Sequence, residues 1–182
     1  SDQDLETYLR GFHGRSSFNY TAIRKGDLIE EIYKRWNNDL INFNHFEQSG
    51  SQSEQNSKSI IRNVIDRYQA RLDELGAMDF VQLEAEVLRR FQNGQLNSWR
   101  DRLQVLIIDE YQDTNLLQEQ IYFEMAHSCK IMSVVGDDDQ SLYRFRGATV
   151  ELFVDFPNRL NARLGSPSNQ YFLRENYRST QP

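Results

Sequence analysis

Carboxylates directly follow two apolar runs in the second half of the chain. The run VLII leads into Asp109 and Glu110, and the run IMSVVG leads into Asp137, Asp138 and Asp139. Carboxylates gathered in one place repel one another and lose hydration unless a cation lies among them. Mg²⁺ suits such a site, because it prefers oxygen and binds through one or two carboxylates plus phosphate oxygens. Asp109 would then face the metal ion, and Glu110 would reach a water as a general base.

Acidic residues at strand ends also occur simply as solvated turn formers, and this alternative stays open for the Asp-Glu pair alone. The neighbouring polar residues favour the metal site. They are Gln112, Asp113 and Thr114 after the first run, and Gln140, Arg144 and Arg146 after the second. Asp113 and Thr114 can instead serve only as caps of the helix that begins near Asn115. A glutamine can contact a metal-bound water or a phosphate oxygen, and arginines can neutralise phosphate.

The pattern around these residues predicts an α/β fold. LQVLIIDE and KIMSVVGDDDQ are short continuous apolar runs, typical of strands buried on both faces. NLLQEQIYFEMAHS between them is amphipathic and predicts a helix, and QYFLRENYRS predicts a third strand. Strand, helix and strand in this order predict a parallel sheet, whose ligands lie beyond the carboxyl ends of the strands.

The first third of the chain predicts helices. Leu28, Ile32, Trp36 and Leu40 recur at helical spacing, with Asp27 as a plausible N-cap. Residues 49–59, SGSQSEQNSKS, have almost no apolar content and predict a mobile loop.

Two further helices follow that predicted loop. Ile61, Ile65, Tyr68 and Leu72 share one face of a helix that stops at Gly76. The next helix is predicted to begin at an Asp79 cap and to end at Gly94, with Phe80 as a core contact. A DNA-side role for Asp79 and Phe80 is the less favoured alternative.

Composition limits the classes of function. The formal net charge of −6 argues against a broadly basic surface that coats nucleic acid, although a narrow track of aromatics and arginines stays possible. With one cysteine, no internal disulfide can form, which fits a reducing cytoplasm. No apolar run is long enough for a membrane span, no signal-peptide pattern is present, and no zinc-ligand spacing occurs. We therefore expect a cytoplasmic protein.

Three motifs in the second half resemble consecutive motifs of the UvrD/Rep/PcrA-like superfamily 1 DNA helicases, in that family's order. They are LIIDEYQDTN, VVGDDDQSLYRFRGA and LRENYRST, and GAMDFVQL resembles the short Asp-Phe segment that precedes them. The resemblance implies a partial RecA-like parallel sheet with flanking helices over residues 77–182. Residues 1–76 are similar in position and character to the helical subdomain 1B of these helicases.

By this resemblance, the chain is part of an ATP-dependent DNA helicase with ATP and Mg²⁺ as cofactors, and a role in DNA repair is implied. Asp109 would bind Mg²⁺, Glu110 would activate the attacking water, and Gln112 would help to couple nucleotide to DNA. Gln140 and Arg178 would contact the γ-phosphate, and Tyr177 would stack on adenine. Each role matches the chemistry of its side chain, because phosphoryl transfer needs cations at the phosphate oxygens and a positioned water.

The same resemblance assigns single-stranded DNA to the YRFRG segment. Many relatives carry Trp where this chain has Phe145, and that ring stacks on a DNA base. Phe retains a π-face for stacking, worth about 1–3 kcal/mol per base. Tyr143 is a second DNA-binding candidate, and packing roles for Phe145 and Tyr143 stay open.

The phosphate-cradling sequence G-x-x-x-x-G-K-[ST] does not occur in the 182 residues. We therefore expect this chain alone to be inactive, with the intact parent as the enzyme. Three explanations stay open: a fragment of a longer helicase, a degenerate helicase, or a chain joined across other segments. A non-catalytic nucleotide- or DNA-binding module is an alternative function. A metal-dependent nuclease is disfavoured, because no lysine lies beside Asp109 or Asp137.

Overall fold

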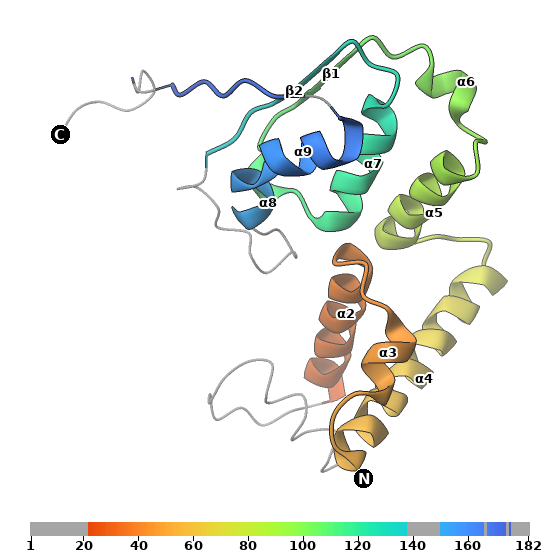
Figure 1. Cartoon of the computed structure of the whole chain (residues 1–182). Helices are drawn as coiled ribbons and strands as arrows, with labels where there is room; N and C mark the ends of the chain where they lie inside the picture. Colours follow the sequence, from red (N-terminus) through yellow and green to blue (C-terminus); the bar gives the residue numbers. More distant parts are fainter. Residues whose placement is uncertain (1–21, 138–149, 166, 174, 176–182) are drawn as a thin grey trace.

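The computed structural model describes residues 22–137, 150–165, 167–173 and 175 (Figure 1). Its helical and strand elements are α2 (Ala22–Asn38), α3 (Phe43–Gln48), α4 (Gln52–Glu74), α5 (Phe80–Gln92), α6 (Asn97–Arg100), β1 (Val105–Ile108), the 3-10 turn η1 (Tyr111–Asp113), α7 (Leu116–Ala126), β2 (Ile131–Val134), α8 (Val150–Val154) and α9 (Phe156–Leu164). Helices α2–α4 gather at one end of the molecule and the strands with α7–α9 at the other (Figure 1).

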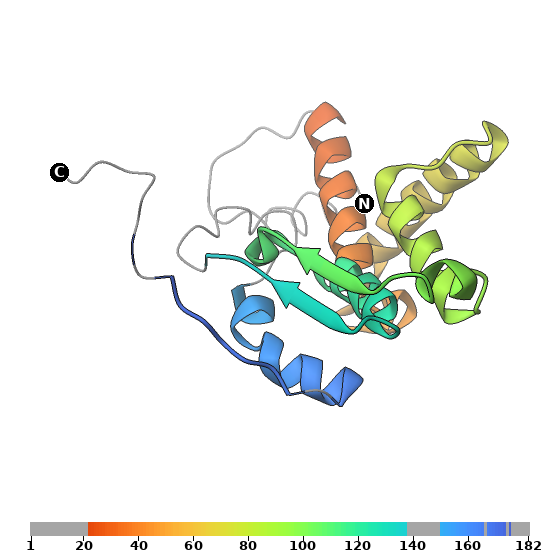
Figure 2. The same ribbon diagram turned by 90° about the horizontal axis from the view of Figure 1, so that it is seen from above.

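The strands β1 and β2 pair in parallel, with Val105 opposite Ile131 and Ile108 opposite Val134. Figure 2 shows both arrows running in the same direction. The connection between them passes through α7, which is the strand–helix–strand unit that the apolar runs predicted. The predicted α/β fold is therefore confirmed.

Helices α7 and α9 both pack on the same face of this two-stranded sheet. Leu106 and Ile108 of β1 lie in one core cluster with Phe123 of α7 and Phe156 and Leu160 of α9. The other face of β1 is open, and the side chain of Ile107 is 68% exposed. The prediction that the strands are buried on both faces is therefore wrong for the described residues. The continuous apolar run does not distinguish a covered second face from an open one.

The helix that begins the described part of the chain starts earlier than its predicted cap. Helix α2 runs from Ala22, so Asp27 lies within it and does not cap it. Its apolar stripe is buried as predicted at Leu28, Ile32 and Trp36. Leu40 lies beyond the helix, in a left-handed conformation with φ of 52°, and its side chain is exposed. The stripe therefore ends one turn before the pattern indicated.

The segment predicted as a loop over residues 49–59 is mostly helical. Helix α4 begins at Gln52, and Ser51 caps it through a capping box with Glu54. The first turns of α4 are largely polar. Nζ of the buried Lys58 in these turns donates to the carbonyl of Ser49 at 2.7 Å, and this bond holds the helix against the residues that precede it. The capping signal S-x-x-E, rather than the lack of apolar residues, indicates the structure of this segment.

Further along, the end of α4 and both ends of α5 lie close to their predicted positions, whereas α4 begins earlier than predicted. Gly76 has a φ of 60° after α4, and Asp79 caps α5 by accepting from the backbone N–H of Gln82 at 2.7 Å. On α4, Ile61 is buried, but Tyr68 is exposed. The predicted apolar face of α4 is therefore buried in the middle of the helix and more exposed toward its end.

Helix α5 connects the two ends of the molecule. Val81 near its start belongs to the core cluster of α2 and α4, whereas Leu88 and Phe91 pack with α7. Phe80, predicted as a core contact, has 87% of its side chain exposed, so that prediction is wrong. At the first position of α5 the side chain points away from the stripe that Val81 and Leu88 define.

No strand forms over residues 170–173, where the sequence predicted a third one. Tyr171, Phe172 and Leu173 are exposed. Residue 174 and residues 176–182 lie outside the described part. A strand needs a partner for its backbone hydrogen bonds, and the described residues do not supply one to this segment.

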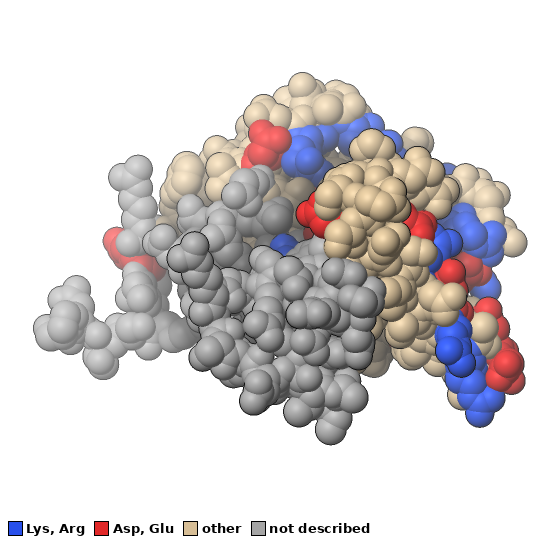
Figure 3. All heavy atoms as spheres, turned by 90° about the horizontal axis from the view of Figure 1, so that it is seen from below, with Lys and Arg blue, Asp and Glu red and all other residues tan. Residues whose placement is uncertain are grey.

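Charged side chains of both signs lie side by side along one edge of the face shown in Figure 3. On α4, Arg62 pairs with Asp66 and Arg71 pairs with Glu74. Among the helices that the structure describes, none is long and apolar enough to cross a membrane.

Candidate nucleotide site

The carboxyl ends of β1 and β2 meet, as the sequence predicted for the two acidic segments. The backbone N–H of Val135 donates to the carbonyl of Ile108 at 2.8 Å, which continues the ladder beyond β2. Asp109 and Glu110 follow the end of one strand, and Asp137 follows the other. This edge is where ligands of parallel sheets bind.

The chain turns sharply at Glu110. This residue has φ of 51° and ψ of 40°, the left-handed conformation, which costs a non-glycine residue roughly 1–3 kcal/mol. The backbone N–H of Glu110 donates to Oδ1 of Asp109 at 2.9 Å. The N–H of Tyr111 donates to the carbonyl of Val135 at 2.9 Å. The first contact lies within the turn and the second holds the turn against the end of β2, while the Asp109 and Glu110 side chains stay exposed.

Gln112 joins the two acidic segments. Its Nε2 donates to Oε2 of Glu110 at 2.6 Å, and its Oε1 accepts from the backbone N–H of Asp137 at 3.0 Å. The side chain is only 2% exposed, so both ends of the amide are held inside the protein. The sequence marked Gln112 as a phosphate or water contact, but it did not indicate this bridge.

Gly136 leaves the space that Gln112 occupies. A Cβ atom at this position would lie 2.6 Å from Oε1 of Gln112 and 3.1 Å from the ring of Phe153. The close approach explains a glycine here, since any side chain would push against a buried, hydrogen-bonded amide.

Residues near the turn have other roles than the sequence suggested. Asn115, and neither Asp113 nor Thr114, caps α7, because its side chain accepts from the backbone N–H of Gln118 at 2.8 Å. Thr114 is buried, and Oδ1 of Asp113 is a buried oxygen without a hydrogen bond in the described part of the chain. The predicted cap was therefore misplaced by one or two residues.

The acidic residues predicted to share a metal ion are described only in part. Asp109 and Asp137 are described, whereas residues 138 and 139 are not. Within the described ranges, no group of three or more His, Cys, Asp or Glu side chains lies close enough to hold a metal ion.

Five predicted site residues lie outside the described residues: Gln140, Tyr143, Phe145, Tyr177 and Arg178. Their roles remain predictions.

A buried polar network next to the turn has no counterpart in the sequence-based predictions. Glu119 of α7 is 0% exposed, and it accepts from the hydroxyl of Tyr111 at 3.0 Å and from Nε of Arg159 at 2.9 Å. Burial, and then the negative charge of Glu119, raises the pKa of Tyr111, so its hydroxyl stays protonated and donates. No motif reveals the contact with Arg159, which lies on a helix far along the chain.

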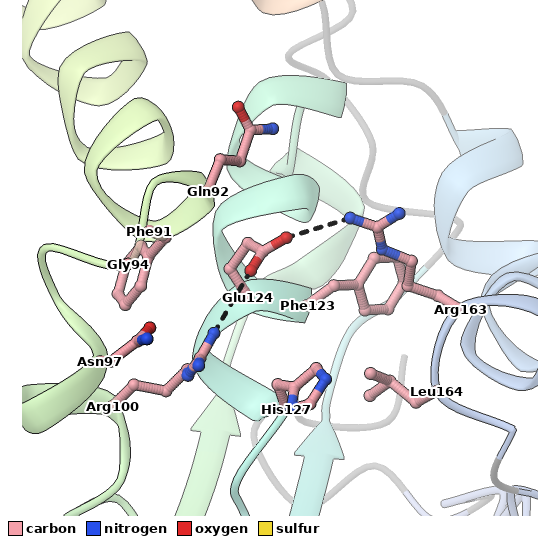
Figure 4. Close-up of a pocket in the computed structure, with 10 residues that line it drawn as sticks. All are labelled: Phe91, Gln92, Gly94, Asn97, Arg100, Phe123, Glu124, His127, Arg163 and Leu164. Carbon is pink, nitrogen blue, oxygen red and sulfur yellow. Dashed lines mark hydrogen bonds and ion pairs between the residues drawn. The ribbon is translucent and has the colours of Figure 1, made fainter.

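A pocket of about 460 Å³ lies at the other end of the strands, lined by the residues labelled in Figure 4. Nη2 of Arg163 donates to Oε1 of Glu124 at 3.0 Å, and Arg100 approaches the same carboxylate from the opposite side at 3.6 Å. Arg100 precedes β1 and His127 precedes β2, so the pocket lies toward the amino ends of the strands. It is therefore separate from the acidic residues at their carboxyl ends.

The fold is that of an α/β protein with an acidic turn at the carboxyl ends of two parallel strands. A buried glutamine, Gln112, links this turn to the segment that follows the second strand. Residues 2–161 match the family model of the UvrD/REP helicase N-terminal domain. The chain therefore belongs to the UvrD/REP helicase family.

Individual relatives agree with this assignment. A probable DNA helicase II homolog of Mycoplasma capricolum is 30% identical over 149 residues, which cover 81% of this chain and 20% of that protein. The ATP-dependent DNA helicase PcrA of Staphylococcus aureus is 33% identical over 123 residues, which cover 66% of this chain and 16% of PcrA. PcrA of Staphylococcus epidermidis is 32% identical over the same number of residues. The chain thus spans a fifth or less of the relatives it matches.

Proposed function

We propose that this chain is part of an ATP-dependent DNA helicase that couples ATP hydrolysis to movement along single-stranded DNA. Family membership supports the proposal, and the matched PcrA proteins are named as ATP-dependent DNA helicases. The observation that carries it is the turn at the carboxyl ends of β1 and β2. There Gln112 links Glu110 to the backbone of Asp137.

The residues of this edge fit Mg²⁺-bound ATP. Asp109 presents an exposed carboxylate, a hard oxygen donor of the kind that Mg²⁺ prefers. When bound, Mg²⁺-ATP supplies a terminal phosphoryl group that is transferred to water. Asp109 holds the metal ion in this proposal and so fixes the nucleotide at the end of β1.

Glu110 acts as the general base. Its carboxylate is exposed at the turn, where it can accept a proton from the attacking water. Gln112 limits the orientations of that carboxylate, because its Nε2 donates to Oε2 of Glu110 at 2.6 Å. The same amide accepts from the backbone N–H of Asp137. A movement of Asp137 would therefore move Gln112 and, with it, the carboxylate of Glu110.

The family resemblance supplies the remaining roles. Gln140 and Arg178 contact the γ-phosphate, and Tyr177 stacks on adenine. Phe145, with Tyr143 two residues before it in sequence, contacts single-stranded DNA through its ring. Gln140 and Phe145 lie in one short stretch of sequence, QSLYRF, so one segment can respond to both ligands.

We further propose that this chain by itself hydrolyses ATP negligibly, because it lacks the lysine-containing phosphate loop that supplies charge stabilisation. The test is steady-state ATP hydrolysis with Mg²⁺, with and without single-stranded DNA. We compare this chain with the full-length protein that carries it. DNA-stimulated turnover in the full-length protein alone is the expected result. Rapid turnover by this chain would refute its inactivity, and metal-dependent DNA cleavage without ATP would indicate a nuclease instead.

A further inference from the structure

Tyr111, the residue directly after Glu110, is fixed at both ends. Its backbone N–H donates to the carbonyl of Val135 at 2.9 Å, and its hydroxyl donates to Oε1 of Glu119 at 3.0 Å. Its ring is fully buried and packs edge-on against Phe156, with ring centroids 5.0 Å apart. The position of the η1 turn therefore depends on what holds Glu119.

Arg159 holds Glu119. Its Nε donates to both carboxylate oxygens, at 3.0 and 2.9 Å, and its Nη2 also donates to Oε2. A fully buried carboxyl group is costly unless it is paired and hydrogen-bonded, so this guanidinium compensates for the burial of Glu119 beneath the turn. The network thus joins η1, α7 and α9.

The left-handed conformation of Glu110 needs support from the residues around it, and this network can supply that support. An unfavourable backbone conformation persists only where the surrounding structure determines it. Glu110 is itself exposed and has little packing of its own. The buried anchor nearest to it in the chain is Tyr111, which the turn presents to Glu119.

We propose that Glu119 and Arg159 are positioning residues for the general base. They hold the Tyr111 hydroxyl, and through Tyr111 they keep Glu110 in the left-handed conformation that presents its carboxylate at the strand edge. This inference rests on the proposed function. The competing explanation is an ion pair that contributes to stability alone, and it predicts no specific effect on turnover.

The mildest test variant is Tyr111→Phe, which removes one hydroxyl and keeps the ring. In the full-length protein we expect DNA-stimulated kcat to fall about tenfold, a part of the roughly 10²–10⁴-fold contribution of a positioned base. We expect KM for Mg²⁺-ATP and the affinity for single-stranded DNA to stay within about twofold of wild type, because substrate binding does not use the hydroxyl.

Arg163→Met is the matched control. Arg163 lies on α9 and pairs with Glu124 of α7, so its loss removes an ion pair between the same two helices. Its side chain is 48% exposed, and its carboxylate partner is not the one that holds Tyr111. We expect full kcat in this variant, with a melting temperature measured alongside that of Tyr111→Phe.

Arg159→Met and Glu119→Gln should lower kcat in the same way, provided that they fold. Tyr111→Phe decides the question if they do not. Wild-type kcat in a folded Tyr111→Phe, or a loss no larger than that of Arg163→Met, would overturn the positioning role while leaving the proposed function intact. A wild-type protein without DNA-stimulated hydrolysis would instead refute the proposed function, and the positioning role with it.

Discussion

The amide of Gln112 lies between the Glu110 carboxylate and the backbone of the neighbouring strand segment. Nε2 donates to Glu110 at 2.6 Å, and Oε1 accepts from the N–H of Asp137 at 3.0 Å. Because the amide is buried, one bond cannot lengthen without disturbing the other. The proposed base and the second acidic segment are therefore held as one unit.

Gly136→Ala tests this unit. The new Cβ would lie 2.6 Å from Oε1 of Gln112, so the amide must move and its bonds must weaken. We expect the free energy of unfolding of this chain to fall by about 1–3 kcal/mol, as for overpacking in other cores. DNA-stimulated ATP hydrolysis by the full-length protein should fall as well. Urea unfolding and steady-state kinetics measure the two effects, and unchanged values in both would show that the space is not needed.

Gly26→Ala serves as the control and is a prediction in itself. Gly26 lies inside α2, and an added Cβ would meet nothing within 4 Å. Alanine loses less conformational freedom than glycine in a helix, so the free energy of unfolding should rise by about 0.5–1 kcal/mol. Loss of stability in urea unfolding would contradict the position of this residue within the helix.

The two adjacent carboxylates should separate in their effects. In the full-length protein, Glu110→Gln should leave ATP binding largely intact and lower turnover by about 10²–10⁴-fold, the contribution of a positioned base. Asp109→Ala should instead weaken the binding of Mg²⁺-nucleotide. Equilibrium nucleotide binding and single-turnover kinetics distinguish them. Normal turnover in Glu110→Gln would show that the roles are assigned wrongly.

Phe145→Ala should weaken the binding of single-stranded DNA by roughly 1–3 kcal/mol, because one stacked base loses its aromatic partner. DNA-free ATP hydrolysis by the full-length protein should change little. Fluorescence anisotropy gives the DNA affinity, and thermal melting on the same sample reports stability. Unchanged affinity together with a much lower melting temperature would assign Phe145 to packing.

Stability should fall at alkaline pH through the buried tyrosines. Burial, and then the Asp79 carboxylate, raises the pKa of Tyr33 to about 12. The folded protein holds the Tyr33 proton more tightly than the unfolded chain. The contribution of protonated Tyr33 to the free energy of unfolding is therefore full below about pH 10, and it is lost as pH rises toward 12. Tyr33→Phe should reduce that alkaline loss in urea unfolding. A variant that loses stability with pH as steeply as wild type would exclude a contribution from Tyr33.

The sequence by itself determined the order of β1, α7 and β2 and the identity of the acidic turn. Local signals were sufficient for these features. An apolar run predicts β1, a helical stripe predicts most of α2, and a capping residue with a later glycine delimits α5. Such signals lie within a few residues of the structure they specify, so they are readable without a partner segment. The motif order was sufficient to indicate the helicase family for the same reason.

Only the tertiary structure decided how the turn is held and which faces are covered. Ile107 is open to solvent although its run is as apolar as a buried strand, because coverage depends on helices elsewhere in the chain. Gln112 reaches Asp137, and Glu119 pairs with Arg159, across separations of 25 and 40 residues. No local pattern encodes these contacts, since each depends on how helices and strands pack. The left-handed Glu110 likewise follows from the anchors around it, and not from any preference of glutamate for that conformation.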